Sequence, residues 1–180
     1  AVTLGLAFAG KFPWAEVPSY ILAQFIGAML GALVVWINFS SHYKITPGEA
    51  EKRGTFCTGP AIKNYPINFF NELTGTFVLI FVILYFTEPV VDVEMLGEMR
   101  IGLGSIGALP VSFLVVSIGM SLGGTTGYAI NPARDLGPRI MYSLLPIPAK
   151  GSSDWSYSWI PVLGPIVGAA IAAGLFLMLN

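Results

Sequence analysis

The sequence predicts an all-α membrane protein built as an inverted repeat, and three features of the chain indicate this fold class. The composition suits a lipid solvent, because 54% of the 180 residues are hydrophobic and 11% are charged, against about 25% charged in soluble domains. Four apolar stretches are long enough to cross a bilayer. Two shorter apolar stretches, interrupted by glycine or proline, occupy corresponding places along the chain, as re-entrant half-helices do.

Charge and composition argue against several classes of function. The net charge of −1 offers no basic surface for a nucleic acid. The single cysteine, Cys57, rules out an internal disulfide. Spaced His/Cys ligands and Ser/His/Asp sets are missing from the sequence, so we expect no metal, no cofactor and no enzyme. The chain opens inside an apolar run without a secretory signal, so we expect its true start to lie upstream.

A membrane-spanning helix needs about 20 apolar residues. We therefore expect spans at residues 17–37, 67–87, 101–122 and 159–179. Trp14 and Trp36 flank the first span, and in a helix they lie about 33 Å apart, which suits two interfacial anchors. Small residues also recur four apart, which lets helices approach closely or simply reflects ordinary bundle packing; the pairs include Gly27 with Gly31 and Gly164 with Gly168.

The two short apolar segments, residues 1–9 and 132–145, are the expected half-helices. The second would be about 20 Å long, against a hydrocarbon core of about 30 Å. Both contain the pattern A-x-x-L-G, at residues 1–5 and 133–137, followed by a polar connection and a span with Gly-Ala near its middle. Each copy therefore reads as a half-helix followed by a span. By symmetry we expect two further spans and an Asn-Pro pair upstream of Ala1.

Asn131 and Pro132 form a helix-start signal, because Asn is a good N-cap and Pro suits the first helical position. If two such half-helices met end to end, they would present Asn donors and positive dipole ends to one spot. That arrangement accepts water or a hydroxyl group and repels a cation. The alternative is an ordinary N-cap at a loop–helix junction.

Arg134 is unexpected in an apolar segment, because a guanidinium there costs about 3 kcal/mol on insertion scales and normally faces a cavity or a partner. Asp135 suits a helix N-terminus and could pair with Arg134 or Arg139. Upstream, residues 121–129 are rich in Gly and Thr and predict extended backbone that lines a water-filled path. Together these features predict a pore constriction; the alternative is a solvated salt bridge at the membrane surface.

Glu72 is a lone carboxylate inside an expected span, a position that indicates function. It could brace a re-entrant loop, relay protons or lie near the headgroups. We favour the bracing role, because no second titratable group lies in another span to form a relay. Residues 38–66 and 88–98 are polar or acidic and are expected to be loops.

The motifs NPARD at 131–135, GPRI at 137–140 and WIPVLGPIVGA at 159–169 resemble the major intrinsic protein (aquaporin) family, especially its glycerol facilitator or aquaglyceroporin branch. The resemblance covers essentially the whole chain. It implies the aquaporin fold of six transmembrane helices and two re-entrant half-helices in a single channel domain, here residues 1–180 without the first two spans. It also implies a homotetramer in the lipid bilayer of the plasma membrane, with one pore in each protomer.

The resemblance further assigns roles to individual residues. The pore centre would comprise Asn131, Pro132, Ala133 and Ala1, and the selectivity filter would comprise Arg134, Tyr128 and Gly119. Asp135 matches the aspartate typical of polyol-conducting members. The pore carbonyls would come from Gly127, Tyr128 and Ala129, and the loop braces would be Glu72 and Gln24. The chain departs from the family in lacking the first Asn-Pro and the filter aromatic of the second span, and in carrying Tyr128 where phenylalanine is common.

The function implied is a passive channel for glycerol and other small neutral solutes, with water also passing. A water-selective aquaporin is the alternative within the class, although Gly119 and Asp135 argue against it. An inverted-repeat secondary transporter would need a clustered ion site near the midplane, and Glu72 alone does not supply one. Loop charges by themselves would place residues 38–66 in the cytoplasm, whereas the family places that loop outside; we follow the family.

Overall fold

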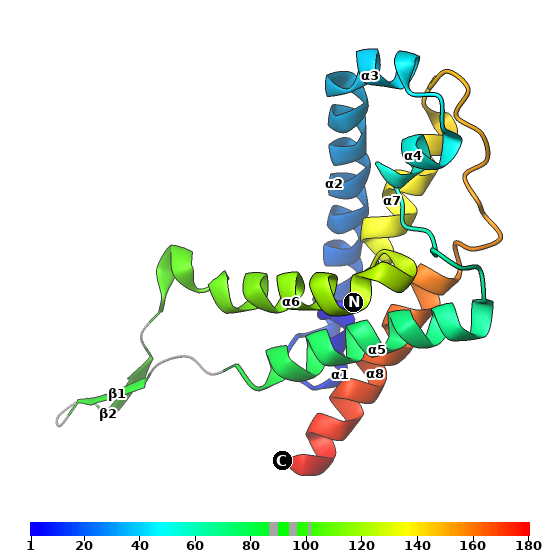
Figure 1. Cartoon of the computed structure of the whole chain (residues 1–180). Coiled ribbons are helices and arrows are strands. Elements are labelled where there is room, and N and C mark those ends of the chain that lie inside the picture. Colours follow the sequence, from blue (N-terminus) through cyan, green and yellow to red (C-terminus); the bar gives the residue numbers. More distant parts are fainter. Residues whose placement is uncertain (87–89, 94–96, 101) are drawn as a thin grey trace.

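The computed structural model describes residues 1–86, 90–93, 97–100 and 102–180. Its described elements form a cluster of helices from which two long arms project at a wide angle (Figure 1). In chain order they are α1 (Val2–Phe8), η1 (Trp14–Glu16), α2 (Val17–Asn38), α3 (Ser40–Ile45), α4 (Glu49–Gly54), α5 (Tyr65–Leu84), β1 (Val90–Val93), β2 (Gly97–Arg100), η2 (Gly104–Ile106), α6 (Leu109–Thr126), α7 (Pro132–Leu144) and α8 (Ile160–Leu179).

Four of these helices, α2, α5, α6 and α8, are long and apolar enough to cross a membrane. Each has a proline in its first turn, where the missing N–H has no intrahelical partner to lose. Three of them differ by three residues or fewer at either end from the spans expected at 17–37, 67–87 and 159–179. The short helices α1 and α7 occupy the segments expected to be half-helices.

Helix α6 departs from the expected span at 101–122. It begins at Leu109, because Pro110 starts the helix and the preceding Gly104 has a φ of +54°, which a right-handed helix does not use. It continues through the Gly/Thr-rich residues to Thr126 and ends where Gly127 adopts φ +77°, a left-handed cap. The prediction of extended backbone across 121–129 is therefore wrong for 121–126 and correct only from Gly127 onward.

The connection between α5 and α6 contains a two-stranded antiparallel hairpin rather than a plain loop. Strand β1 pairs with β2, with Val90 opposite Arg100 and Val93 opposite Gly97. Residues 88, 89 and 94–96 of the acidic stretch expected to be a loop lie outside the described residues, as do residue 87 of the expected span 67–87 and residue 101 of the expected span 101–122. The other expected loop, residues 38–66, contains the short helices α3 and α4.

The most extensive helix contact joins α5 and α8. A methyl group added at Gly168 would lie 2.3 Å from the carbonyl oxygen of Leu73, and one added at Gly164 would lie 2.8 Å from the Cβ of Glu72. Helices α5 and α8 therefore approach closely at this glycine pair, the first of the two possibilities that the sequence left open. Gly27 and Gly31 behave differently, since within the described residues nothing lies within 4 Å of a methyl group added at either position.

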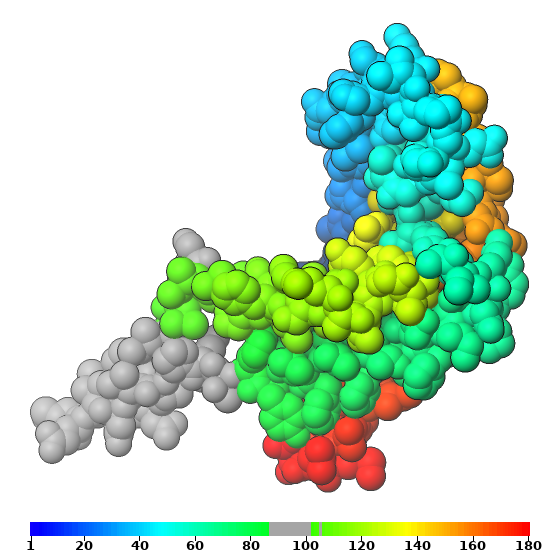
Figure 2. All heavy atoms as spheres, in the orientation of Figure 1, coloured from blue at the N-terminus to red at the C-terminus, as the bar shows by residue number. Residues whose placement is uncertain are grey.

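Each half-helix packs against the span of the other copy of the repeat. Helix α7 lies along α2, where a methyl group at Gly137 would come within 2.9 Å of the Cβ of Ala28. Helix α1 lies against α8 and also contacts α5. The two arms α2 and α6 diverge from this cluster, and Figure 2 shows the molecule open between them. The N-terminus, where α1 begins, lies where the two arms meet (Figure 1).

Candidate pore and selectivity filter

Helix α7 begins as the sequence predicts, with Asn131 as its cap. The Oδ1 atom of Asn131 accepts a hydrogen bond of 3.1 Å from the backbone N–H of Ala133. Pro132 follows as the first helical residue. Within the described residues the side-chain Nδ2 of Asn131 donates no hydrogen bond, so the amide N–H groups are available to a ligand.

The N-terminal ends of the two half-helices line one small cavity. Its volume is about 160 Å³, and its walls include Ala1 from the start of α1 and Asn131 and Ala133 from the start of α7. The side chain of Gln24, on α2, also lines this cavity and donates a hydrogen bond of 2.8 Å to Thr3 Oγ1 on α1. Gln24 thus connects α2 to the first half-helix beside this cavity, and its predicted bracing role stays a prediction.

The segment between α6 and α7 has an unusual backbone. Tyr128 and Ile130 adopt φ values of +39° and +42°, in the left-handed region that costs a non-glycine residue about 1–3 kcal/mol. Glu72, which is 1% exposed, accepts hydrogen bonds from the N–H of Ala129 (3.0 Å) and of Ile130 (2.8 Å). These two hydrogen bonds fix the backbone of both residues and offset part of the strain. Glu72 thus contacts the segment that the sequence predicts it to brace, and its role as a brace stays a prediction.

The carbonyl groups of the same segment face a different environment. Among the described residues, the carbonyl oxygens of Gly127, Tyr128 and Ala129 accept no hydrogen bond. Tyr128 and Ala129 line a cavity of about 270 Å³ that also contacts Asn131 and Arg134. Non-helical backbone at membrane depth is tolerated where it lines a hydrated path, which is the role that the sequence predicts for these carbonyls.

Arg134 lies between two cavities. It lines the 270 Å³ cavity and also a larger one of about 470 Å³, whose other walls include Gln24, Phe56 and Pro138. Its Nη1 donates a long hydrogen bond of 3.5 Å to the carbonyl of Phe56, and none of the described carboxylates forms an ion pair with it. Most of the guanidinium hydrogen-bonding capacity therefore faces the cavities.

Asp135 has a different environment from its neighbour Arg134. It is fully buried and forms a two-pronged ion pair with Arg139, with Nε–Oδ1 at 2.8 Å and Nη2–Oδ2 at 3.0 Å. Its Oδ2 also accepts hydrogen bonds of 2.7 Å from both the N–H and the hydroxyl of Thr58. Of the two partners that the sequence leaves open, the structure selects Arg139. Asp135 thereby ties α7 to residues 55–64, a contact with Thr58 that the sequence did not predict.

Arg139 extends this connection to a second loop. Its Nη2 donates to the carbonyl of Thr58 (2.8 Å) and its Nη1 to the carbonyl of Ser153 (2.6 Å). Because residues 55–64 and 145–159 both attach to one buried guanidinium, they are held over the same side of α7. The hydrogen bonds of Asp135 and Arg139 therefore hold the backbone near Arg134, including the carbonyl of Phe56.

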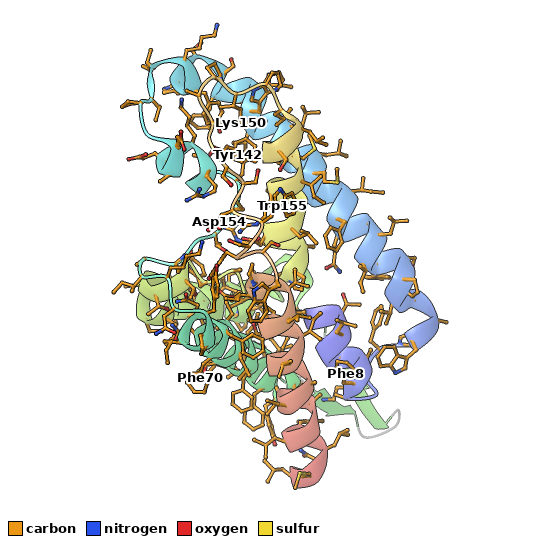
Figure 3. All side chains as sticks on the ribbon, turned by 90° about the vertical axis from the view of Figure 1, so that its right-hand side faces the viewer. Phe8, Phe70, Tyr142, Lys150, Asp154 and Trp155 are labelled. Carbon is orange, nitrogen blue, oxygen red and sulfur yellow. The ribbon has the colours of Figure 1, made fainter. Side chains whose placement is uncertain are left out.

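Two lysines, one on α4 and one in the loop after α7, donate to backbone carbonyls at and beyond the C-terminal end of α7. Lys52, only 3% exposed, donates to the carbonyl of Pro148 at 2.6 Å. Lys150 donates to the carbonyls of Ser143 (2.6 Å) and Leu145 (2.7 Å), which caps the C-terminal end of α7. The hydroxyl of Tyr142 donates to the Lys150 carbonyl, and Figure 3 shows these two residues together at that end of the helix.

A surface ion pair also connects residues 55–64 with residues 145–159. Lys63 Nζ lies 2.8 Å from Asp154 Oδ1, and Asp154 lies farther along the same loop in Figure 3. Partial burial alone would raise the pKa of Asp154, but the hydrogen bonds from Lys63 and Ser156 outweigh it, so the pKa of this carboxyl lies below its ordinary value. The pair therefore stays ionised at neutral pH.

The expected filter residues lie together. Tyr128 is 39% exposed and shares the 270 Å³ cavity with Arg134. Gly119, on α6, lies behind the tyrosine ring, since a methyl group added there would be 3.0 Å from Tyr128 Cζ. The cavity thus has Arg134, Tyr128 and the following backbone segment on its walls, with a side-chain-free helix position behind the tyrosine ring.

Two re-entrant half-helices whose N-termini share a cavity, among four membrane-length helices, define a membrane channel of the inverted-repeat class. The sequence profile described as "Major intrinsic protein" matches residues 1–176. The chain belongs to this family. It is a multi-pass integral membrane protein with the aquaporin fold.

Individual relatives agree with this assignment. The chain is 53% identical over 176 residues to the "Glycerol uptake facilitator protein" of Streptococcus pneumoniae serotype 4, covering 98% of this chain and 70% of the relative. It is 51% identical over 180 residues to the protein of the same name from Bacillus subtilis, covering 98% and 60%. The X-ray structure of the aquaglyceroporin from Plasmodium falciparum superposes with a TM-score of 0.72 at 29% identity, covering 97% of this chain and 68% of that one. Two of these relatives are named as glycerol uptake facilitators and the third as an aquaglyceroporin.

Proposed function

We propose that the protein is a passive channel for glycerol and other small neutral solutes, with water also passing. The observation that carries the proposal is the composition of the 270 Å³ cavity, where the Arg134 donor, the ring of Tyr128 and the carbonyl-bearing segment meet. Glycerol has hydroxyl groups along one edge and C–H groups along the other. The guanidinium and the carbonyls suit the hydroxyl groups, and the ring suits the carbon chain.

The remaining site residues fit this function. Asn131 would offer its amide donors to a passing hydroxyl at the pore centre formed with Pro132, Ala133 and Ala1. The positive ends of the half-helices and the Arg134 guanidinium would oppose the passage of cations. We also propose that the protein acts as a homotetramer in the plasma membrane, with one pore per protomer.

Two alternatives remain as outcomes of the test. A water-selective channel would need a narrower filter, and the absence of a side chain at Gly119 argues against one. A relative from Lactiplantibacillus plantarum that is 42% identical is named "D/L-lactic acid transporter", so lactic acid is a useful second solute.

The test is osmotic reswelling of proteoliposomes that contain the protein, in gradients of glycerol, lactic acid or sucrose as an impermeant control. We expect glycerol to cause reswelling at a rate that rises linearly with its gradient, as diffusion through a channel requires. Fast water flux without glycerol flux would indicate a water-selective channel instead. Saturation of the glycerol rate at low concentration would indicate a carrier.

A further inference from the structure

We propose that Gly123, together with Gly119, forms a seat for the Tyr128 ring and that Gly123 thereby determines which solutes the filter admits. The proposal rests on the channel function proposed above. Gly123 was not among the residues that the sequence indicated, because it fell in the stretch expected to be extended. The structure instead places Gly119 and Gly123 four residues apart in α6, on one face of the helix.

The tyrosine ring lies directly against this face. A methyl group added at Gly119 would be 3.0 Å from Cζ and 3.1 Å from Cε2 of Tyr128. One added at Gly123 would be 2.6 Å from Cδ1 and 3.1 Å from Cε1. The ring therefore extends across both glycines, with its base at Gly123 and its hydroxyl end at Gly119.

The cavity determines where a displaced ring would go. Tyr128 is 39% exposed and lines the 270 Å³ cavity together with Arg134 and Asn131. Its backbone cannot easily retreat, because Glu72 holds the next N–H, that of Ala129, at 3.0 Å. A side chain that pushes the ring away from α6 must therefore push it into the cavity and toward Arg134.

The two glycines differ in how close an added methyl group would lie to the tyrosine ring. Nonbonded carbon atoms ordinarily lie about 3.5–4.0 Å apart. An alanine at Gly123 would thus require the ring to move by about 1 Å, whereas an alanine at Gly119 would require a smaller shift. The helix itself tolerates either change, because alanine has the higher helix propensity.

The experiment compares single alanine substitutions along α6 in the reconstituted protein. Gly123→Ala and Gly119→Ala are the test variants, and Gly124→Ala is the matched control, since a methyl group there has nothing within 4 Å among the described residues. Glycerol and water permeabilities are measured for each variant. We expect Gly123→Ala to lower glycerol permeability about tenfold and water permeability much less, Gly119→Ala to have a weaker effect, and Gly124→Ala to match the parent.

A double variant separates the seat from a general effect on folding. If Tyr128 transmits the effect, Gly123→Ala should cause no further loss in a protein that already carries Tyr128→Val. Equal behaviour of Gly123→Ala and Gly124→Ala would overturn the seat, and so would a full Gly123→Ala loss in the Tyr128→Val background. The glycerol permeability of the unsubstituted protein tests the proposed function separately. If only water passes, the same comparisons made with water still decide whether the seat exists.

Discussion

At the scale of single residues, the adjacent charges Arg134 and Asp135 serve different purposes. Successive helix residues point in directions about 100° apart, so Arg134 reaches the cavities while Asp135 turns into the protein toward Arg139. The sequence predicted a pore-facing arginine from the energetic cost of its charge. It did not resolve the partner of Asp135, although the four-residue spacing to Arg139 was available as a signal.

The contact between Asp135 and Thr58 can be tested by a matched pair of substitutions. Thr58→Val removes the hydroxyl that donates to Oδ2 of Asp135 at 2.7 Å, whereas Thr58→Ser keeps a hydroxyl. We expect Thr58→Val to lower the free energy of unfolding by about 1.5–3 kcal/mol, the value of a hydrogen bond to a buried charge, and Thr58→Ser to stay close to the parent. Denaturation in detergent measures both; equal stability of the two variants would contradict the contact's importance.

Arg134→Val tests the filter directly. The substitution removes a donor that lines both the 470 Å³ and the 270 Å³ cavity, and with it the positive charge that opposes cations. We expect larger polyols and small cations to enter the pore while glycerol continues to pass. Reswelling with a series of polyols and a cation-flux assay measure this change. Unaltered exclusion of both would count against a filter role for Arg134.

At the scale of elements, the attachment of residues 55–64 to α7 determines the surroundings of Arg134. Cys57 reports on this attachment, because it is the single cysteine of the chain and is 2% exposed. Burial raises the pKa of its thiol from 9.0 to about 11. Since the thiolate is the reactive form, labelling should be slow at neutral pH for lack of both access and thiolate.

We therefore expect maleimide to label Cys57 at pH 8 at least about a hundredfold more slowly in the native protein than in denatured protein, given the difference in thiolate fraction. The native rate should rise as the pH approaches 11. Thr58→Val should accelerate labelling by loosening the segment, and Thr58→Ser should not. Rapid labelling of the native parent would show that this segment is not held against α7.

The elements differed in how well the sequence predicted them, for physical reasons. Helices α2, α5 and α8 follow from apolar length alone. Helix α6 ends later in the chain than the sequence predicts. Its glycine-rich C-terminal turns have low intrinsic helix propensity, which tertiary contact with the tyrosine ring overrides. The hairpin was missed because its strands have only four residues each, too few for a periodic pattern to be distinctive.

At the scale of the whole molecule, the fold depends on how the two copies of the internal repeat pack against each other. The repeated A-x-x-L-G pattern predicted two corresponding half-helices, and this correspondence fits α1 and α7. It could not predict that each half-helix packs on the span of the other copy, because a repeat identifies equivalent segments and not their contacts. The Cβ clearance of 2.9 Å between Gly137 of α7 and Ala28 of α2 shows how tight that packing is on one side.

The contact between α5 and α8 connects overall stability to the site, because α5 carries Glu72. An alanine at Gly168 would place its methyl group 2.3 Å from the carbonyl oxygen of Leu73 and 3.1 Å from the backbone nitrogen of Phe77. Neither backbone atom can move without moving α5. Overpacking of this kind costs about 1–3 kcal/mol, and a displaced α5 would shift the Glu72 carboxylate away from the N–H groups of Ala129 and Ile130.

Gly168→Ala should therefore lower both the midpoint of thermal unfolding in detergent and the glycerol permeability in proteoliposomes. Gly174→Ala, on the same helix, is the control, since among the described residues nothing lies within 4 Å of a methyl group there. If Gly168→Ala matched this control in stability, α5 and α8 would not be in close contact. If it lost stability but kept full permeability, the pore segment would hold its conformation independently of the position of α5.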